Sequence, residues 1–468
     1  MKPYLSATLI RVLTALVVVS VLLTAVACSS SLGGSDSALT DGGEAVTLPP
    51  VTIPDLTDDR VPTDTAVYAE RLEALFATTV PASESDFICE NNEDGVTLLG
   101  YEGGETVLVI PTTVGGRPVT AIADSAFKNM TSLKAVSIPD TVTSVGKSAF
   151  EGCKNLTSMR TPVYTCEDAP YFGALFGATT HEANGGFVPV SLSTLVLTKG
   201  TIIPDYAFYA CRGLEVVALP EATVEIGDFS FYGCEGMAYI TTADTALTTL
   251  GEHAFAGCVR LLNMTLPDTV AYMGEGMLEG CGKLESLTIP FVGGSADDSS
   301  VESAYLGYLF GASHYTFTAG YIPASLITVT VSKGCTAIPA NAFFECASIR
   351  EIHIPEGVTT VGRRAFYGCE GLSAMTLPDS VVSVGDDAFH GCIRMQTFVG
   401  GAGLTELGVQ SFMGCLSLAA VTLPKTVTTL PNSCFSGCLS LTTLTAEGVT
   451  AVGDKTFHQC DKLTGWGK

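Results

Sequence analysis

The hydrophobic positions between residues 346 and 460 recur in a 23-residue unit with almost no slippage. Each unit closes on a Phe that is followed three residues later by a Cys, except that the last step between cysteines is 22 residues. A fixed period of about 20 to 50 residues predicts a solenoid, in which a unit too small to form its own core packs against its neighbours. The ladder cysteines are Cys346, Cys369, Cys392, Cys415, Cys438 and Cys460.

One unit, residues 349–369, reads IREIHIPEGVTTVGRRAFYGC. Its first part alternates apolar and polar residues up to a proline, which is typical of a short strand with one buried face. A second extended run follows at residues 358–361, and the AFYGC segment predicts a single helical turn that Gly368 ends. The predicted inward residues are Ile349, Ile352, Ile354, Val358, Val361, Ala365, Phe366 and Cys369.

The unit resembles the BspA-like class of bacterial leucine-rich repeats, whose pattern is L-x-x-V-x-I-P, then V-x-x-I-G, then A-F-x-G-C. Residues 133–139 read LKAVSIP, residues 142–146 read VTSVG and residues 149–153 read AFEGC. The resemblance covers about residues 85–468 and implies a β-rich leucine-rich-repeat solenoid with short strands. It also implies a bacterial surface protein that binds host or neighbouring-cell components without catalysis.

The Phe of the A-F-x-G-C segment gives a count of the coils. It recurs at twelve positions, one of which holds Leu278, so we expect about twelve coils of about 23 residues. The positions are Phe127, Phe150, Phe208, Phe231, Phe255, Leu278, Phe343, Phe366, Phe389, Phe412, Phe435 and Phe457.

Residues 1–27 have the pattern of an export signal, because Lys2 and Arg11 precede an apolar run that ends in AVA. Cys28 follows directly, so this segment resembles a lipoprotein signal in which that cysteine is lipidated. A plain signal peptide or an uncleaved anchor is the alternative. Residues 28–63 are rich in Ser, Gly, Asp, Thr and Pro, which predicts a disordered tether. We therefore expect an exported protein that a lipid anchors to the cell membrane or the outer surface.

Residues 64–110 are predicted to cap the solenoid of residues 111–468. A helix is expected over residues 65–79, with its apolar face packed near the first coil, or alternatively as a partner-binding helix. Strand-like runs at residues 96–99 and 106–110 flank a glycine-rich segment and predict a hairpin. Such a hairpin would cover the open end of the stack.

Two long gaps interrupt the ladder, the first after Cys153 and the second after Cys281. The extra segments, at about 160–191 and 290–325, share an aromatic motif, YFGALFGA in the first and YLGYLFGA in the second. Insertions in repeat proteins often form the binding face, and tyrosine is common in binding hot spots. The alternative is that these aromatic residues pack the insertions onto the solenoid. The predicted ligand contacts are Tyr171, Tyr305, Tyr308 and Tyr315.

Charge and the reactive residues narrow the function further. The chain has 23 Lys and Arg against 48 Asp and Glu, a net charge of −25, which argues against nucleic acid and against anionic lipid surfaces. The ladder cysteines occupy inward positions, so buried free thiols are expected, although disulfides between adjacent coils are left open. The six His show no metal-binding spacing, and no nucleophile or phosphate-binding motif occurs.

These observations predict no metal, no cofactor and no catalysis. The leading hypothesis is a lipid-anchored surface protein that recognises a protein or glycan on host or neighbouring cells. The alternative is a structural or assembly protein of the bacterial envelope without a foreign ligand.

Overall fold

The computed structural model describes residues 66–295, 303–332 and 334–464. The chain divides into two units, Met1–Val61 and Pro62–Lys468, and every described residue belongs to the second. The predicted export signal, the predicted lipidation at Cys28 and most of the predicted tether therefore lie outside the described residues. Within those residues, no helix has the length and apolar content that crossing a bilayer requires.

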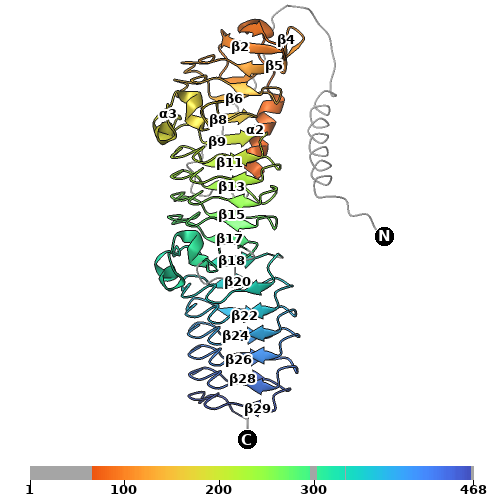
Figure 1. Ribbon diagram of the computed structural model, residues 1–468, viewed down its shortest axis with the longest axis vertical. Helices are drawn as coiled ribbons and strands as arrows, with labels where there is room; N and C mark the ends of the chain where they lie inside the picture. The colour runs from red at the N-terminus through yellow and green to blue at the C-terminus, as the bar shows by residue number, and fades with distance from the viewer. Residues whose placement is uncertain (1–65, 296–302, 333, 465–468) are drawn as a thin grey trace, which may run out of the picture. The chain divides into compact units, whose positions relative to one another are not determined.

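The second unit is a solenoid whose coils stack along one axis (Figure 1). Each coil contributes one strand to a long parallel ladder, formed by a six-stranded sheet and two four-stranded sheets. The ladder contains β3 (Val107–Val109), β6 (Ala135–Ser137), β8 (Ser158–Thr161), β9 (Thr194–Leu197), β11 (Val216–Ala218), β13 (Tyr239–Thr241), β15 (Asn263–Thr265), β17 (Ser286–Ile289), β18 (Thr328–Val331), β20 (Glu351–His353), β22 (Ala374–Thr376), β24 (Thr397–Val399), β26 (Ala420–Thr422) and β28 (Thr443–Thr445).

Shorter strands form a second parallel ladder on another side of each coil. Each is two residues long and places one buried apolar residue in the core, as Val361 does in β21 (Thr360–Val361). The others are β7 (Ser144–Val145), β10 (Ile202–Ile203), β12 (Glu225–Ile226), β14 (Thr249–Leu250), β16 (Tyr272–Met273), β19 (Ala337–Ile338), β23 (Ser383–Val384), β25 (Glu406–Leu407), β27 (Thr429–Leu430) and β29 (Ala451–Val452).

The A-F-x-G-C segment forms linked turns rather than the predicted helical turn. Arg364 has a φ of 55°, and this left-handed conformation is incompatible with a right-handed helical turn. The amide of Phe366 donates to the Ala388 carbonyl of the next coil at 2.8 Å, whereas the amide of Cys369 donates to the Phe366 carbonyl at 3.2 Å. Because amides bond both to the next coil and within the turn, this side of each coil is tied to its neighbour.

The predicted inward face is confirmed, except that Ile354 is only half-buried. The Phe side chains form a continuous stack, in which the Phe366 ring lies 5.3 Å from that of Phe343 and 4.9 Å from that of Phe389. The Cys369 thiol donates to the Phe343 carbonyl of the preceding coil at 3.0 Å. A ladder cysteine thus fills a small apolar site and also satisfies a buried carbonyl.

All fifteen described cysteines are free, and all but Cys89 are buried. The prediction of buried free thiols is therefore confirmed for this part of the chain. Burial raises the pKa of the Cys153 thiol to about 11 and that of Cys234 to about 12. These thiols remain protonated at neutral pH and are poor nucleophiles, since the thiolate is the reactive form.

The ladder has fourteen strands, two more than the coils counted from the Phe positions. Two short helices, η2 (Phe172–Phe176) and η4 (Leu306–Phe310), lie within the stack in the place of an A-F turn. The amide of Phe150 donates to the Leu175 carbonyl at 2.8 Å, as it would to the next ordinary coil. Each predicted insertion therefore contains one complete coil that the Phe count missed.

The predicted hairpin between residues 96–99 and 106–110 is wrong. β1 (Phe87–Asn91) pairs antiparallel with β2 (Val96–Tyr101), and β3 pairs with β6 in the long ladder. The turn between β1 and β2 contains Asp94-Gly95, a dipeptide that favours tight hairpin turns and a stronger signal than the glycine-rich segment. The cap is completed by η1 (Glu84–Asp86), β4 (Thr113–Val114) and β5 (Arg117–Ile122), with β5 paired to β2, β4 and β7.

The predicted N-terminal helix is present as α2 (Ala66–Thr78). It does not sit on the end of the stack but covers the outer face of the ladder beside β9 and β11 (Figure 1). Leu72 and Phe76 are buried there against Ala135, Val196 and Ala218. Small apolar residues on the outer face of these strands therefore provide the seat for the helix.

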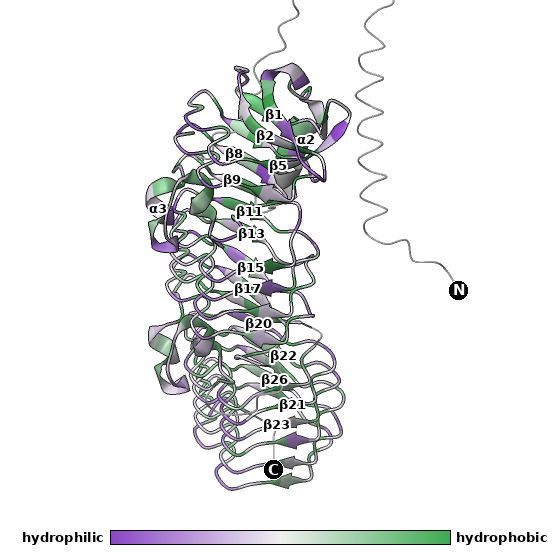
Figure 2. Cartoon of the chain, turned by 45° about the horizontal axis from the view of Figure 1, so that its top comes forward, coloured by the Kyte–Doolittle hydropathy of each residue, from purple (hydrophilic) through white to green (hydrophobic). Residues whose placement is uncertain are grey.

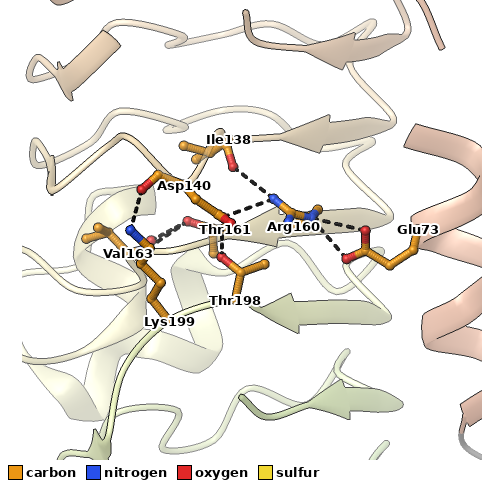
Figure 3. Close-up of polar contacts among 8 residues, drawn as sticks. All are labelled: Glu73, Ile138, Asp140, Arg160, Thr161, Val163, Thr198 and Lys199. Atoms are coloured by element: carbon orange, nitrogen blue, oxygen red, sulfur yellow. Dashed lines mark hydrogen bonds and ion pairs between the residues drawn. The ribbon is translucent and has the colours of Figure 1, made fainter. Parts of the chain in front are cut away.

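A polar cluster fastens α2 to the ladder (Figure 3). The Nε of Arg160 on β8 donates to both carboxylate oxygens of Glu73 at 2.9 and 3.2 Å, and its Nη1 lies 3.2 Å from Asp140. Burial opposes ionisation of Asp140, but the hydrogen bond from Thr198 and the charges of Arg160 and Lys199 lower its pKa below the ordinary value. Asp140 thus stays ionised and holds Arg160 in position for Glu73.

The outer face of the ladder is open in its C-terminal part. In β22, β24 and β28 only the central residue is buried, and the two flanking residues are exposed. Most of these exposed residues are threonines, such as Thr376, Thr422 and Thr445.

Candidate ligand-binding edge

The chain leaves the stack at two excursions, residues 177–191 and residues 311–325. The first contains η3 (His181–Ala183) and α3 (Asn184–Phe187), and the second contains η5 (Tyr315–Gly320). Both project from the same edge of the solenoid in the two views (Figures 1 and 2). The prediction that the extra segments meet at one edge is therefore confirmed, although only these parts of the segments leave the stack.

Each excursion presents large apolar side chains to solvent. Phe187 is 47% exposed in the first excursion, and Phe317 is 57% exposed in the second. Val190 and Tyr321 are exposed beside them. Apolar residues that gather on a protruding segment are typical of an interaction site.

Of the four tyrosines predicted to contact ligand, Tyr305 is a packing residue, which corrects that prediction. It is 1% exposed, and its hydroxyl donates to the Ala312 carbonyl at 2.6 Å inside the stack. Burial raises the pKa of its phenol to about 12. Tyr305 sits at the start of η4, which completes a coil, and is therefore held in the core and unavailable to a ligand.

The other three predicted tyrosines are half-buried. Tyr171 and Tyr308 precede or belong to the short helices within the stack and pack on the core. Burial raises the pKa of both phenols. Tyr315 lies in the second excursion, with its ring edge-on to that of Phe344 at 5.2 Å. Tyr315 is thus the predicted contact that lies on the projecting part of the edge.

Below the second excursion runs an aromatic column that the sequence reasoning missed. We define the second column as Phe344, Tyr367 and His390, each directly after a ladder Phe. The rings of Phe344 and Tyr367 are parallel and 5.0 Å apart, and those of Tyr367 and His390 are 4.9 Å apart. Tyr315 contacts the upper end of this column, so the excursion and the column form one surface.

A corresponding first column, Tyr209 and Tyr232, lies below the first excursion, with its rings 5.1 Å apart. Beside it, Tyr206 stacks on Phe229 at 5.2 Å, and the His181 ring of the excursion lies 4.3 Å from that of Tyr206. The two excursions therefore have the same construction, in which a projecting segment rests on stacked aromatic rings.

A sequence signal for the columns exists. A Phe or Tyr directly follows the ladder Phe at four positions only, and these are in the two coils after each excursion. Elsewhere the position holds small, charged, Met or His side chains, such as Ala256 and Glu279. The four are Tyr209, Tyr232, Phe344 and Tyr367.

A cleft of about 400 Å³ opens beside the second column. Its acidic residues are Glu345 and Glu370, and neither carboxylate has a hydrogen bond or ion pair with another residue in the described part of the chain. A Cβ placed on Gly368 would lie 3.0 Å from the Cγ of Glu345, so the Glu345 side chain lies along the cleft floor. The lining residues are Ala319, Glu345, Ala347, Tyr367, Gly368, Glu370, His390, Gly391 and Ile393.

The charged groups around the second column are arranged so that the cleft is negative. Arg364 is within reach of Asp387, with Nε 3.5 Å from Oδ2, and its guanidinium lies 5.7 Å from the centre of the Tyr367 ring. The same carboxylate is 3.2 Å from Nδ1 of His390. Because Asp387 balances Arg364, the charges of Glu345 and Glu370 are left without a counter-charge.

The stacked rings determine what the edge offers to a ligand. Parallel rings about 5 Å apart cover one another's faces, so their edges and polar tips point outward. Carboxylates, phenols and imidazoles are hydrogen-bonding groups suited to sugar hydroxyls, backbone groups and basic side chains. In the described ranges no three His, Cys, Asp or Glu residues gather in a way that would hold a metal ion.

Comparison with known proteins places the repeat. The family model described as "BspA type Leucine rich repeat region" matches in six copies, over residues 112–169, 184–300 and 336–464. No curated protein matches the chain.

Several solved structures are similar to the chain. A leucine-rich repeat protein from Bacteroides ovatus is 19% identical, with 82% of this chain and 93% of that chain covered and a TM-score of 0.29. A leucine rich cell surface protein from Faecalibacterium prausnitzii is 20% identical, with 82% and 88% covered and a TM-score of 0.23. The T. pallidum leucine rich repeat protein is 15% identical, with 82% and 91% covered and a TM-score of 0.23.

Proposed function

Because the chain belongs to the BspA type of leucine-rich-repeat proteins, we propose that it is a cell-surface adhesin that binds a protein or glycan on host or neighbouring cells. The observation that carries the proposal is the pairing of each excursion with an aromatic column at one edge. The proposal includes no catalytic role, no cofactor and no nucleic-acid partner.

The columns are better explained by binding than by packing. The core beneath them is already complete, since the ladder Phe and Cys of these coils are fully buried. Tyr232 is exposed and Tyr209 is half-buried, so the outer rings add little to that core. Tyrosine at an exposed edge offers a large contact area with few rotatable bonds and a polar tip.

The proposal places the protein outside the cell, with its membrane contact made through lipid on Cys28 alone. The AVAC sequence after an apolar run motivates this assignment. The variant Cys28→Ser should release the protein from the membrane fraction, because a lipid chain is the anchor. Unchanged membrane retention together with an unchanged N-terminal mass would contradict lipidation.

Binding to whole cells tests the adhesin proposal. Tyr209→Ala/Tyr232→Ala/Tyr367→Ala in the full protein should weaken binding to host or neighbouring cells at least tenfold. The matched control is Thr376→Ala/Thr422→Ala/Thr445→Ala, which changes three exposed residues on the open face of the ladder. Loss of binding in the control but not in the tyrosine variant would move the site to the open face.

The envelope alternative predicts a different result in the same experiment. A structural protein without a foreign ligand would show no binding to foreign cells, and its solenoid would be shielded from protease added to intact cells. An adhesin is instead cleaved under those conditions, because its edge must reach its ligand.

A further inference from the structure

We propose that the cleft beside the second column binds a primary ammonium group on an extended ligand, as found in a lysine side chain or an amino sugar. The inference rests on the proposed binding function and specifies the chemistry that one of its two sites selects. It is carried by the placement and charge of Glu345 and Glu370.

Glu345 occupies a position at which the repeat favours glycine. The residue two places after the ladder Phe is Gly in eight coils, each with a positive φ, and Glu345 adopts the same left-handed backbone with a φ of 53°. A side chain in this conformation costs more than glycine does. The carboxylate is therefore placed on the cleft floor at the expense of local backbone energy. The eight are Gly152, Gly233, Gly257, Gly280, Gly368, Gly391, Gly414 and Gly437.

Glu370 is free because the coil before it lacks a basic partner. In the coils of the first column, the equivalent carboxylate of Glu235 is 3.0 Å from Nε of Arg212. The position equivalent to Arg212 holds Ala347 beside the second column. Glu370 consequently faces the cleft with no guanidinium to neutralise it.

An ammonium group fits this arrangement in charge, hydrogen bonding and size. It carries three donors and no acceptor, and two carboxylates supply charge-assisted acceptors for it. No lysine or arginine lines the cleft, and the acidic chain as a whole attracts cations to its surface. A volume of about 400 Å³ accommodates one lysine side chain or a short run of sugar rings.

The test measures binding of small amines to the full protein at physiological salt, where weak surface attraction is screened. The probes are a glucosamine trimer and a Gly-Lys-Gly peptide, each compared with its N-acetylated form, which keeps the shape but loses the charge. We expect one equivalent of an amine probe to bind and the acetylated form to bind at least tenfold more weakly. The stronger of the two amines identifies the source of the group.

Three variants locate the site. Glu345→Gln/Glu370→Gln removes both charges without changing side-chain shape and should weaken amine binding at least tenfold. Ala347→Arg should act similarly, because it supplies Glu370 with the partner that Arg212 gives Glu235. Glu221→Gln/Glu406→Gln removes two exposed charges outside the cleft and should change binding less than twofold.

The inference is overturned if neither amine binds, if the acetylated probes bind as well, or if the control variant loses as much affinity as the cleft variant. Those outcomes leave the adhesin proposal standing as long as cell binding depends on the two columns. Conversely, amine binding by a protein that binds no cells would support the inference and contradict the adhesin proposal.

Discussion

The two excursion sites are built from the same parts but differ in charge. Each has a projecting segment, two consecutive coils with an aromatic residue after the ladder Phe, and a buried Phe and Cys stack beneath. In the first, Ala210 stands where the second has Glu345, and Arg212 neutralises Glu235 at 3.0 Å. The second site has Ala347 in place of that arginine. The repeat thus fixes the backbone and core, while a few outward positions set what each site can bind.

The largest expected effect tests whether the cores beneath the two sites are equivalent. Burial raises the pKa of Cys234 to about 12 and that of Cys369 well above the ordinary value of 9.0. Unfolded thiols ionise near pH 9, so stability is complete below pH 9 and falls as the pH rises toward 12. Each buried thiol should contribute about 1.4 kcal/mol per pH unit to that loss.

Urea midpoints at pH 8, 9 and 10 measure this alkaline loss. Cys234→Ala and Cys369→Ala should each reduce the pH dependence by the contribution of one thiol, and by equal amounts. A midpoint that does not change with pH would mean that the thiols are exposed or paired. Unequal slopes in the two variants would mean that the cores under the sites differ.

Removal of one ladder ring at each site is the next largest effect. Phe231 and Phe366 are fully buried, and each lies between two parallel rings at 4.9 to 5.3 Å. Phe231→Ala and Phe366→Ala should each lower the free energy of unfolding by about 3–5 kcal/mol, because each leaves a cavity. Denaturant titration of both variants is the measurement, and a change within error in either would place that ring outside the core.

A transplant of the acidic residues should convert the first site into the second. Ala210→Glu/Arg212→Ala places an acidic side chain at position 210 and frees Glu235 from its partner. We expect calorimetry with the amine probe to show a second equivalent, with an affinity within about tenfold of the first, because the scaffold is the same. If only one equivalent binds, the shape of the second excursion matters as much as its charges.

Loss of the ion pair alone should have the smallest effect. The side chains of Arg212 and Glu235 are 61% and 55% exposed, and exposed pairs contribute little to stability. Arg212→Ala should change the free energy of unfolding by less than about 0.5 kcal/mol. A larger loss in thermal or urea unfolding would show that Arg212 also packs against the turn, and would make charge an incomplete account of the difference.

The strictly repeated part of the fold followed from sequence, because each inward residue meets copies of itself in the next coil. The period therefore identified Phe366 and Cys369 as core without further information. The two additional coils were missed because η2 and η4 replace the A-F turn with a different local sequence and lack the ladder Cys. Their buried rings, Phe176 and Phe310, were recognised only as parts of an insertion.

Prediction of the site succeeded for the edge and failed for individual residues. Similar sequence in the two segments indicated one kind of element, but it could not separate the half that closes a coil, where Tyr305 lies, from the half that projects. The columns required a comparison of one outward position across all coils. The unpaired charge of Glu370 could not be predicted, since it depends on Ala347 in the neighbouring coil.

The two excursions are separated by five coils, counted from Phe176 to Phe310, and the stack makes that separation rigid. At about 5 Å for each coil, which is the spacing of the stacked rings, the sites stand about 25 Å apart. The solenoid therefore acts as a ruler, graduated in steps of one coil, and a ligand with regularly repeated groups would be read at a fixed interval. Removal of a single 23-residue unit between the sites would shorten that interval by one step while leaving both sites intact.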